Sequence, residues 1–186
     1  MNRFTFVPRW DIEPLSGYPI YSIKDYAFDF VPASESQFQA RFGSAGEGIL
    51  VTDTEQLIVG IETGLLLHVY GYSPYMKWKM CDRVPPSSRG GGVWVHCVRP
   101  LLSGAGEDVR EHLGDAVWFN PQAGWVCLGD VSFVPRDSAV EFASGTVAVI
   151  DEGQLRAVWV RPENWHQVAA SYLEGGRRPV GQRPKL

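Results

Sequence analysis

Thr146-Val-Ala-Val-Ile150, Asp151-Glu-Gly-Gln154 and Leu155-Arg-Ala-Val-Trp-Val160 follow one another in the last third of the chain. Apolar side chains recur with period two on both sides of a short polar turn that contains glycine. This pattern predicts two antiparallel strands joined as a β-hairpin. Two more stretches, residues 49–61 and 116–128, repeat the arrangement of strand, turn and strand. The sequence therefore indicates an antiparallel, β-rich domain.

The first of these hairpins continues into a third strand. After Glu62-Thr-Gly64 the chain enters Leu65-Leu-Leu-His-Val-Tyr70, so residues 49–70 predict a three-stranded meander. The last strand is apolar on both faces, which is typical of a strand in the middle of a sheet that is covered on both sides.

Two helices have recognisable ends. Ser34-Glu-Ser-Gln37 has the form of a capping box and is followed by two phenylalanines one turn apart, which predicts a helix over residues 34–42. A proline and a glutamate mark the start of a second helix over residues 162–174, whose apolar stripe ends at a glycine pair. A shorter helical turn is expected over residues 107–113.

Length and composition suit one folded domain. The chain has 186 residues, of which 45% are hydrophobic and 12% aromatic, enough for a large core. We expect residues 1–176 to form a single β-rich α+β domain of antiparallel meander and hairpin sheets, with two or three short helices. The strands would form either one curved sheet or two packed sheets. Residues 177–186 are expected to be a basic, flexible tail.

Charge is unevenly distributed between the body and this tail. The tail holds four of the 17 basic side chains and none of the 21 acidic ones, so residues 1–176 carry 13 basic and 21 acidic side chains, a balance of −8. Such a body repels nucleic acid and anionic membranes and attracts a basic partner. Solubility alone would also explain the charge. We therefore expect a protein partner, with no nucleic acid and no membrane.

Cysteine usage and the absence of long apolar runs bear on the compartment. Cys81, Cys97 and Cys127 are odd in number and show no CxxC spacing, which is typical of buried thiols in a reducing environment. The sequence has no signal-peptide core and no apolar run of about 18 residues, so we expect a cytoplasmic protein.

The residue types that often perform catalysis show no arrangement for it. His96 and Cys97 are neighbours on a predicted strand, so their side chains point to opposite faces and cannot pair with each other. His112 and His166 are expected on solvated faces of helices, and no two histidines or cysteines have close metal-ligand spacing. We expect no catalytic residue, no metal site and no cofactor.

Two further features have ordinary structural explanations. Asp53, Glu55 and Glu62 fall on predicted turns, where acidic side chains are normally in water. The segment Pro85–Gly92 is rich in glycine but lacks the Gly-Lys-Ser/Thr of a phosphate-binding loop. Neither feature indicates catalysis.

The irregular segment Gly71–Gly92 and the residue just before it contain the candidate binding surface. Aromatic and basic side chains are mixed there, as in protein-binding hot spots. The residues expected to contact a partner are Tyr70, Tyr72, Tyr75, Lys77, Trp78, Lys79 and Arg89. Two alternatives stay open: the rings could fill the core beneath a long loop, or they could stack on single-stranded nucleic acid, which the acidic body disfavours.

Gly145-Thr-Val-Ala-Val-Ile-Asp-Glu-Gly-Gln-Leu-Arg-Ala-Val-Trp-Val-Arg-Pro162 resembles the hairpin-plus-Trp-Pro ending of small bacterial immunity proteins, which accompany secreted polymorphic toxins. The resemblance covers about a tenth of the chain. It implies a cytoplasmic, non-enzymatic inhibitor that binds a cognate toxin or effector domain tightly. It assigns no binding residues.

Two other functions stay open. The first is an enzyme or small-ligand-binding protein with a sheet-face pocket lined by Trp94, His96, Trp118 and Trp125. The second is a structural component of a larger assembly that docks through the basic tail.

Overall fold

The computed structural model describes residues 3–136 and 139–175, so the predicted tail at 177–186 lies outside the described residues. A two-stranded ribbon consists of β1 (Phe4–Arg9) and β9 (Gly92–Cys97). A six-stranded sheet consists of β2 (Gly17–Ser22), β3 (Ala27–Pro32), β4 (Glu47–Val51), β5 (Glu55–Gly60), β6 (Leu66–Tyr72) and β10 (Gly106–Asp108). A seven-stranded sheet consists of β7 (Lys79–Met80), β8 (Ser88–Gly90), β11 (Val117–Asn120), β12 (Trp125–Gly129), β13 (Ala139–Ala143), β14 (Thr146–Asp151) and β15 (Gln154–Val160). The helices are α1 (Glu35–Phe42), α2 (Arg110–Leu113), α3 (Trp165–Gly175) and the short 3-10 helix η1 (Tyr75–Lys77).

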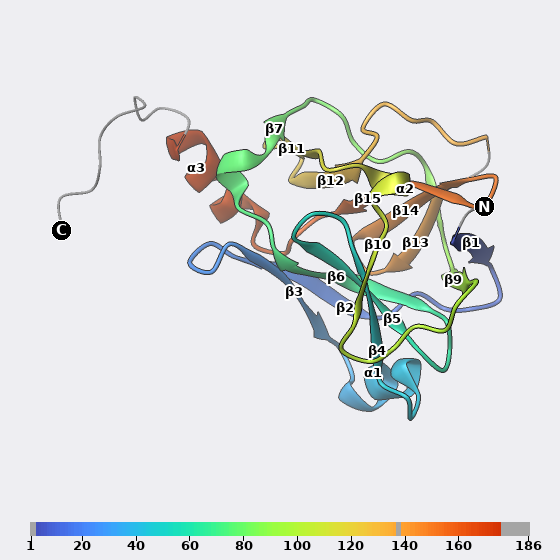
Figure 1. Cartoon of the computed structure of the whole chain (residues 1–186). Helices are drawn as coiled ribbons and strands as arrows, with labels where there is room; N and C mark the ends of the chain where they lie inside the picture. The colour runs from blue at the N-terminus through green and yellow to red at the C-terminus, as the bar shows by residue number, and fades with distance from the viewer. Residues whose placement is uncertain (1–2, 137–138, 176–186) are drawn as a thin grey trace.

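The two large sheets lie one above the other and share one core (Figure 1). The strand order is β10-β4-β5-β6-β3-β2 in one sheet and β7-β11-β12-β15-β14-β13-β8 in the other. Phe28 and Leu57 from the first sheet and Phe119 and Val158 from the second are all fully buried in this core. The prediction of a β-rich domain with short helices is therefore confirmed, in its form with packed sheets.

The hairpin predicted over residues 146–160 forms as expected. β14 and β15 pair antiparallel from Thr146 opposite Val160 to Asp151 opposite Gln154. Glu152 and Gly153 form the turn with φ of 49° and 77°, the backbone that a tight two-residue hairpin turn requires. The hairpins β4–β5 and β11–β12 also form, and β5 and β6 are neighbours, which confirms the predicted meander.

The sheets are mixed rather than purely antiparallel. Three short strands pair parallel to a neighbour: β10 with β4, β7 with β11, and β8 with β13. Each has two or three residues and lies at a sheet edge. Strands of this length are too short to show a period-two pattern in their side chains. For the same reason the helical turn expected over 107–113 is shorter: residues 106–108 are β10, and α2 has only residues 110–113.

The two longer helices, α1 and α3, begin in different ways. Ser34 caps α1, and its Oγ accepts a hydrogen bond from the Gln37 backbone N–H, as the capping-box pattern predicts. Helix α3 begins at Trp165 and not at Pro162. The Asn164 side chain donates to the Tyr21 carbonyl at 2.8 Å and accepts from its N–H at 3.1 Å, so the preceding turn is held against β2.

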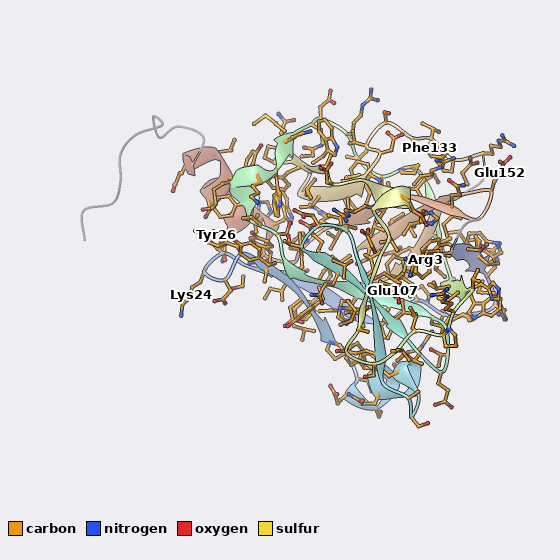
Figure 2. All side chains as sticks on the ribbon, in the orientation of Figure 1. Arg3, Lys24, Tyr26, Glu107, Phe133 and Glu152 are labelled. Carbon is orange, nitrogen blue, oxygen red and sulfur yellow. The ribbon has the colours of Figure 1, made fainter. Side chains whose placement is uncertain are left out.

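The ribbon of β1 and β9 joins the two sheets at one side. The Phe6 N–H donates to the Gly153 carbonyl in the β14–β15 turn at 2.9 Å, and the Val95 N–H donates to the Gly64 carbonyl just before β6 at 2.7 Å. An ion pair between Arg3 and Glu107 ties the start of the ribbon to β10 (Figure 2).

The two outer faces differ. On the outer face of the seven-stranded sheet, Val147, Val149 and Trp159 form a second buried cluster, against which Phe133 packs. On the outer face of the six-stranded sheet, α1 covers only one end (Figure 1). Tyr70 and Tyr72 lie on the uncovered part and are 44% and 47% exposed.

Candidate functional site

Six of the seven predicted contact residues lie at one end of the molecule. Tyr70 and Tyr72 end β6, Tyr75 and Lys77 belong to η1, and Trp78 and Lys79 follow directly. The seventh lies elsewhere.

Arg89 is on β8, which forms the opposite edge of the seven-stranded sheet from β7. Its guanidinium carbon lies 5.1 Å from the ring centre of Trp10. The structure therefore separates Arg89 from the other predicted residues.

The 3-10 helix η1 lies beside α3 (Figure 1). A groove lined by residues of η1, β7 and the end of α3 lies there. Its volume is about 370 Å³. We call it the aromatic–methionine groove and define it by Tyr75, Met76, Trp78, Met80, Tyr172 and Leu173. Met76, Met80 and Leu173 are 60%, 59% and 42% exposed, so apolar surface faces water here. Tyr172 and Leu173 were predicted only as the end of a helical stripe, because nothing in the sequence shows which loop that helix meets.

Trp78 forms the floor of the groove and not its exposed rim. It is 5% exposed, and its ring stacks on Phe28 at 5.8 Å and meets Phe119 edge-on at 5.3 Å. Its indole N–H donates to Ser73 Oγ at 2.9 Å. Trp78 therefore fills the core, as the alternative explanation of this segment expects. Met76 and Met80 on either side of it are exposed.

A buried carboxylate anchors this floor. Ser73 Oγ donates to Glu55 Oε1 at 2.6 Å, and Thr52 Oγ1 donates to Glu55 Oε2 at 2.9 Å. Glu55 is 4% exposed, so the expectation that it lies in water on a turn is wrong. The tight β4–β5 connection instead directs it inward, where two hydroxyl groups satisfy its charge.

Two tyrosine hydroxyls hold the backbone of the same turn. Tyr21 OH donates to the Ser73 carbonyl at 2.6 Å and accepts from the Tyr75 N–H at 3.2 Å. Tyr172 OH donates to the Trp78 carbonyl at 3.2 Å. Burial raises the pKa of both phenols, so both remain protonated donors at neutral pH. The groove is therefore pre-formed.

A row of tyrosines continues from the groove onto the open face of the six-stranded sheet. Tyr26, at the tip of the β2–β3 hairpin, lies 5.5 Å from Tyr75 and 6.4 Å from Tyr72, measured between ring centres (Figure 2). Tyr26 has a φ of 54°, a left-handed conformation that non-glycine residues adopt rarely and that presents its ring to both neighbours. Sequence reasoning missed Tyr26, because its role depends on this turn.

The two predicted lysines are neighbours of the groove residues in sequence but do not line the groove. Lys77 is exposed on η1, and Lys79 Nζ lies 5.2 Å from the ring centre of Trp118.

The alternative pocket of Trp94, His96, Trp118 and Trp125 is divided between two sheets. Trp94 and His96 lie in the ribbon, with ring centres 5.6 Å apart. Trp118 and Trp125 lie on β11 and β12 and pack against the outer cluster of the seven-stranded sheet. The pairs are apart because β9 belongs to the ribbon.

His112 is buried, so the expectation of a solvated position is wrong. Its side chain is 2% exposed and lies edge-on to Phe4 and Phe6, at 6.4 and 5.4 Å between ring centres. Neither ring nitrogen makes a hydrogen bond to a described residue. Burial therefore lowers the pKa of His112. The reason is that α2 is a single turn packed on the core, with no solvated face at this position.

Among residues 3–136 and 139–175, no group of three or more His, Cys, Asp or Glu side chains is placed to hold a metal ion. Within the same ranges, no helix combines the length and apolar character needed to cross a membrane. No protein-family model matches the chain, and comparison with curated proteins gives no significant match.

Proposed function

We propose that this chain is a protein-binding module whose contact surface is the aromatic–methionine groove together with the tyrosine row. The single observation that carries the proposal is the exposure of Met76 on η1 and Met80 on β7, at 60% and 59%. Between them, Trp78 is buried and held by a hydrogen bond to Ser73. When a partner covers apolar side chains that a fixed backbone holds in water, the free energy of the complex decreases.

The composition of the surface suits this task. Tyrosines supply large amphipathic contacts with little side-chain entropy to lose, and methionines adapt their shape to an apolar side chain. The hydrogen bonds of Tyr21, Ser73 and Tyr172 fix the turn before binding, so little ordering remains to oppose association.

The specific version that we propose is an immunity-type inhibitor that binds a cognate bacterial toxin domain in the cytoplasm. It is supported by the resemblance of residues 145–162 to the ending of immunity proteins and by the −8 charge balance of residues 1–176, which speeds association with a basic partner.

Recovery of a partner tests the proposal. Tagged chain should retain one protein in stoichiometric amount from its native host, and the Met76→Glu/Met80→Glu variant should weaken that complex at least about 30-fold, as loss of a hot spot does. Leu102→Glu is the matched control, because Leu102 is 66% exposed and lies outside the groove. Equal loss in both variants, or no partner at all, would contradict the binding proposal.

The immunity version needs a second readout. The recovered partner should arrest growth when produced alone, and co-production of the wild-type chain, but not of the groove variant, should restore growth. A partner without toxicity would leave the binding module standing and remove the inhibitor version.

A further inference from the structure

The segment that joins β9 to β11 bridges the two large sheets, and we call it the α2 strap, residues 98–116 (Figure 1). Its first part contains β10, which pairs with β4 and forms the edge of the six-stranded sheet. Its second part contains α2, which packs against β15 and β12 of the seven-stranded sheet. The strap therefore covers the backbone edge of β4.

A few short contacts hold the strap to the rest of the molecule. β10 has three residues and α2 has four. Leu101, Val109 and Leu113 are buried in the core, and the Val109 N–H donates to the Val51 carbonyl at 2.9 Å. Segments with few buried contacts and few backbone hydrogen bonds open more easily than the strands of the core.

A histidine is buried beside these apolar anchors. The His112 side chain is 2% exposed, and its ring meets Phe4 and Phe6 of β1 edge-on. Both ring nitrogens are buried and have no hydrogen-bond partner among the described residues. A buried polar group without a partner is costly, and a buried charge without one is far more costly. The closed strap therefore disfavours an imidazolium at this position.

The charged groups around His112 do not remove this cost. Arg156 on β15 is close enough for its positive charge to oppose a second one, and its own Nε is buried without a partner among the described residues. Glu111 Oε1 lies 3.6 Å from His112 Nε2, beyond hydrogen-bond distance, on a side chain that is 51% exposed. β12 contains no charged residue, and Arg3, just before β1, is already paired with Glu107.

We propose that the α2 strap is released by acid: when His112 takes up a proton, α2 leaves the core and the strap opens. In the open form water solvates the imidazolium, which no longer faces Arg156. β10 leaves with α2, because only Val109 separates the two elements. β4 then becomes the edge strand, and its unpaired backbone groups can accept a strand of another chain.

The direction of the pH response follows from the burial of His112. Burial lowers the pKa of His112 in the closed strap, while the open strap has the ordinary value of about 6.5. The open form therefore binds more protons than the closed form once the pH falls below about 6.5. Opening becomes more favourable by at most about tenfold per pH unit below that point, and the strap stays closed above it.

Amide hydrogen exchange of the full chain at pH 7.0 and pH 5.5, corrected for the intrinsic exchange rate at each pH, tests the proposal. The amides of Val109, His112 and Gly114 donate the hydrogen bonds that opening breaks. Their protection should be about three- to tenfold lower at pH 5.5 than at pH 7.0. The amides of β14 and β15 should stay at least about tenfold better protected than those of the strap, because only global unfolding exposes them.

Substitutions of the two buried histidines identify the group that responds. His112→Phe keeps a ring between Phe4 and Phe6 but cannot take up a proton, so protection of the strap should be equal at the two pH values. His112→Leu should give the same result with a smaller side chain. His68→Leu is the matched control, because His68 is also buried but lies on β6, outside the strap, so the full response should remain.

Four results would overturn the proposal. The first is equal protection of the wild-type strap at both pH values. The second is a wild-type response in both His112 variants, and the third is loss of the response in His68→Leu. The fourth is loss of protection in the strap and in β14 and β15 by the same factor and to the same level, since the chain would then unfold as a whole.

Discussion

The outer faces of the two sheets differ in how far they are covered. The face around Trp159 in the seven-stranded sheet is dry and covered, with Val147 and Val149 beside it. On the six-stranded sheet α1 covers the outer face around His68, while the part around Tyr70 and Tyr72 is open, with these rings 44% and 47% exposed. The difference teaches that the covered face adds a second apolar cluster to the core, while the other face leaves tyrosine rings in water.

The largest expected contrast is in stability. Trp159→Ala should lower the free energy of unfolding by about 3–5 kcal/mol, because it opens a cavity in the covered face. Tyr70→Ala should change it by about 0.5 kcal/mol or less, because Tyr70 is 44% exposed. Urea unfolding of both variants measures the difference. Similar losses would show that the open face is as structural as the covered one.

The buried carboxylate beneath the groove should give the next largest effect. Glu55→Ala leaves the hydroxyls of Thr52 and Ser73 without their acceptor, which should cost about 1–3 kcal/mol of stability. It should also weaken partner binding, since Ser73 positions Trp78. Asp53→Ala is the control at an exposed position on the same connection. If a stably folded Glu55→Ala variant still bound the partner fully, the hydrogen bonds of Glu55 would not be needed to shape the groove.

Buried neutral histidines should make stability depend on pH. Burial lowers the folded-state pKa of His68 and His112, so the unfolded chain binds more protons than the folded chain once the pH falls below about 6.5. Stability should therefore be complete above that pH and decrease below it, by at most about 1.4 kcal/mol per pH unit for each histidine.

Unfolding at several pH values tests this dependence and separates the two histidines. His112→Leu should reduce the loss of stability at low pH, because it removes one of the two histidines whose pKa burial lowers. If the free energy of unfolding depended on pH in the same way in His112→Leu as in the wild type, His112 would not contribute to that dependence.

Local patterns predicted much of the fold, because they depend on neighbouring residues. The β14–β15 hairpin follows from its alternation and turn, and α1 from its cap and glycine stop. The parallel edge strands β7 and β8 could not be predicted, since backbone pairing of two or three residues leaves no mark on side-chain order.

The candidate site was predicted in part, for the same reason. Its tyrosines and lysines stand out in the sequence as an aromatic, basic segment. That Trp78 is its floor, that Leu173 completes its wall and that Arg89 lies at the opposite edge are consequences of tertiary packing. The burial of Glu55 likewise depends on Ser73, which is 18 residues away along the chain.

Hydrogen exchange of the chain, alone and with its stoichiometric partner, tests the central claim most directly. We predict new protection of amides around η1, β7 and the end of α3, with no change on β8 or around Trp159 in the covered face. Protection centred on β8 or on the covered face, with exchange at η1 unchanged, would contradict the account.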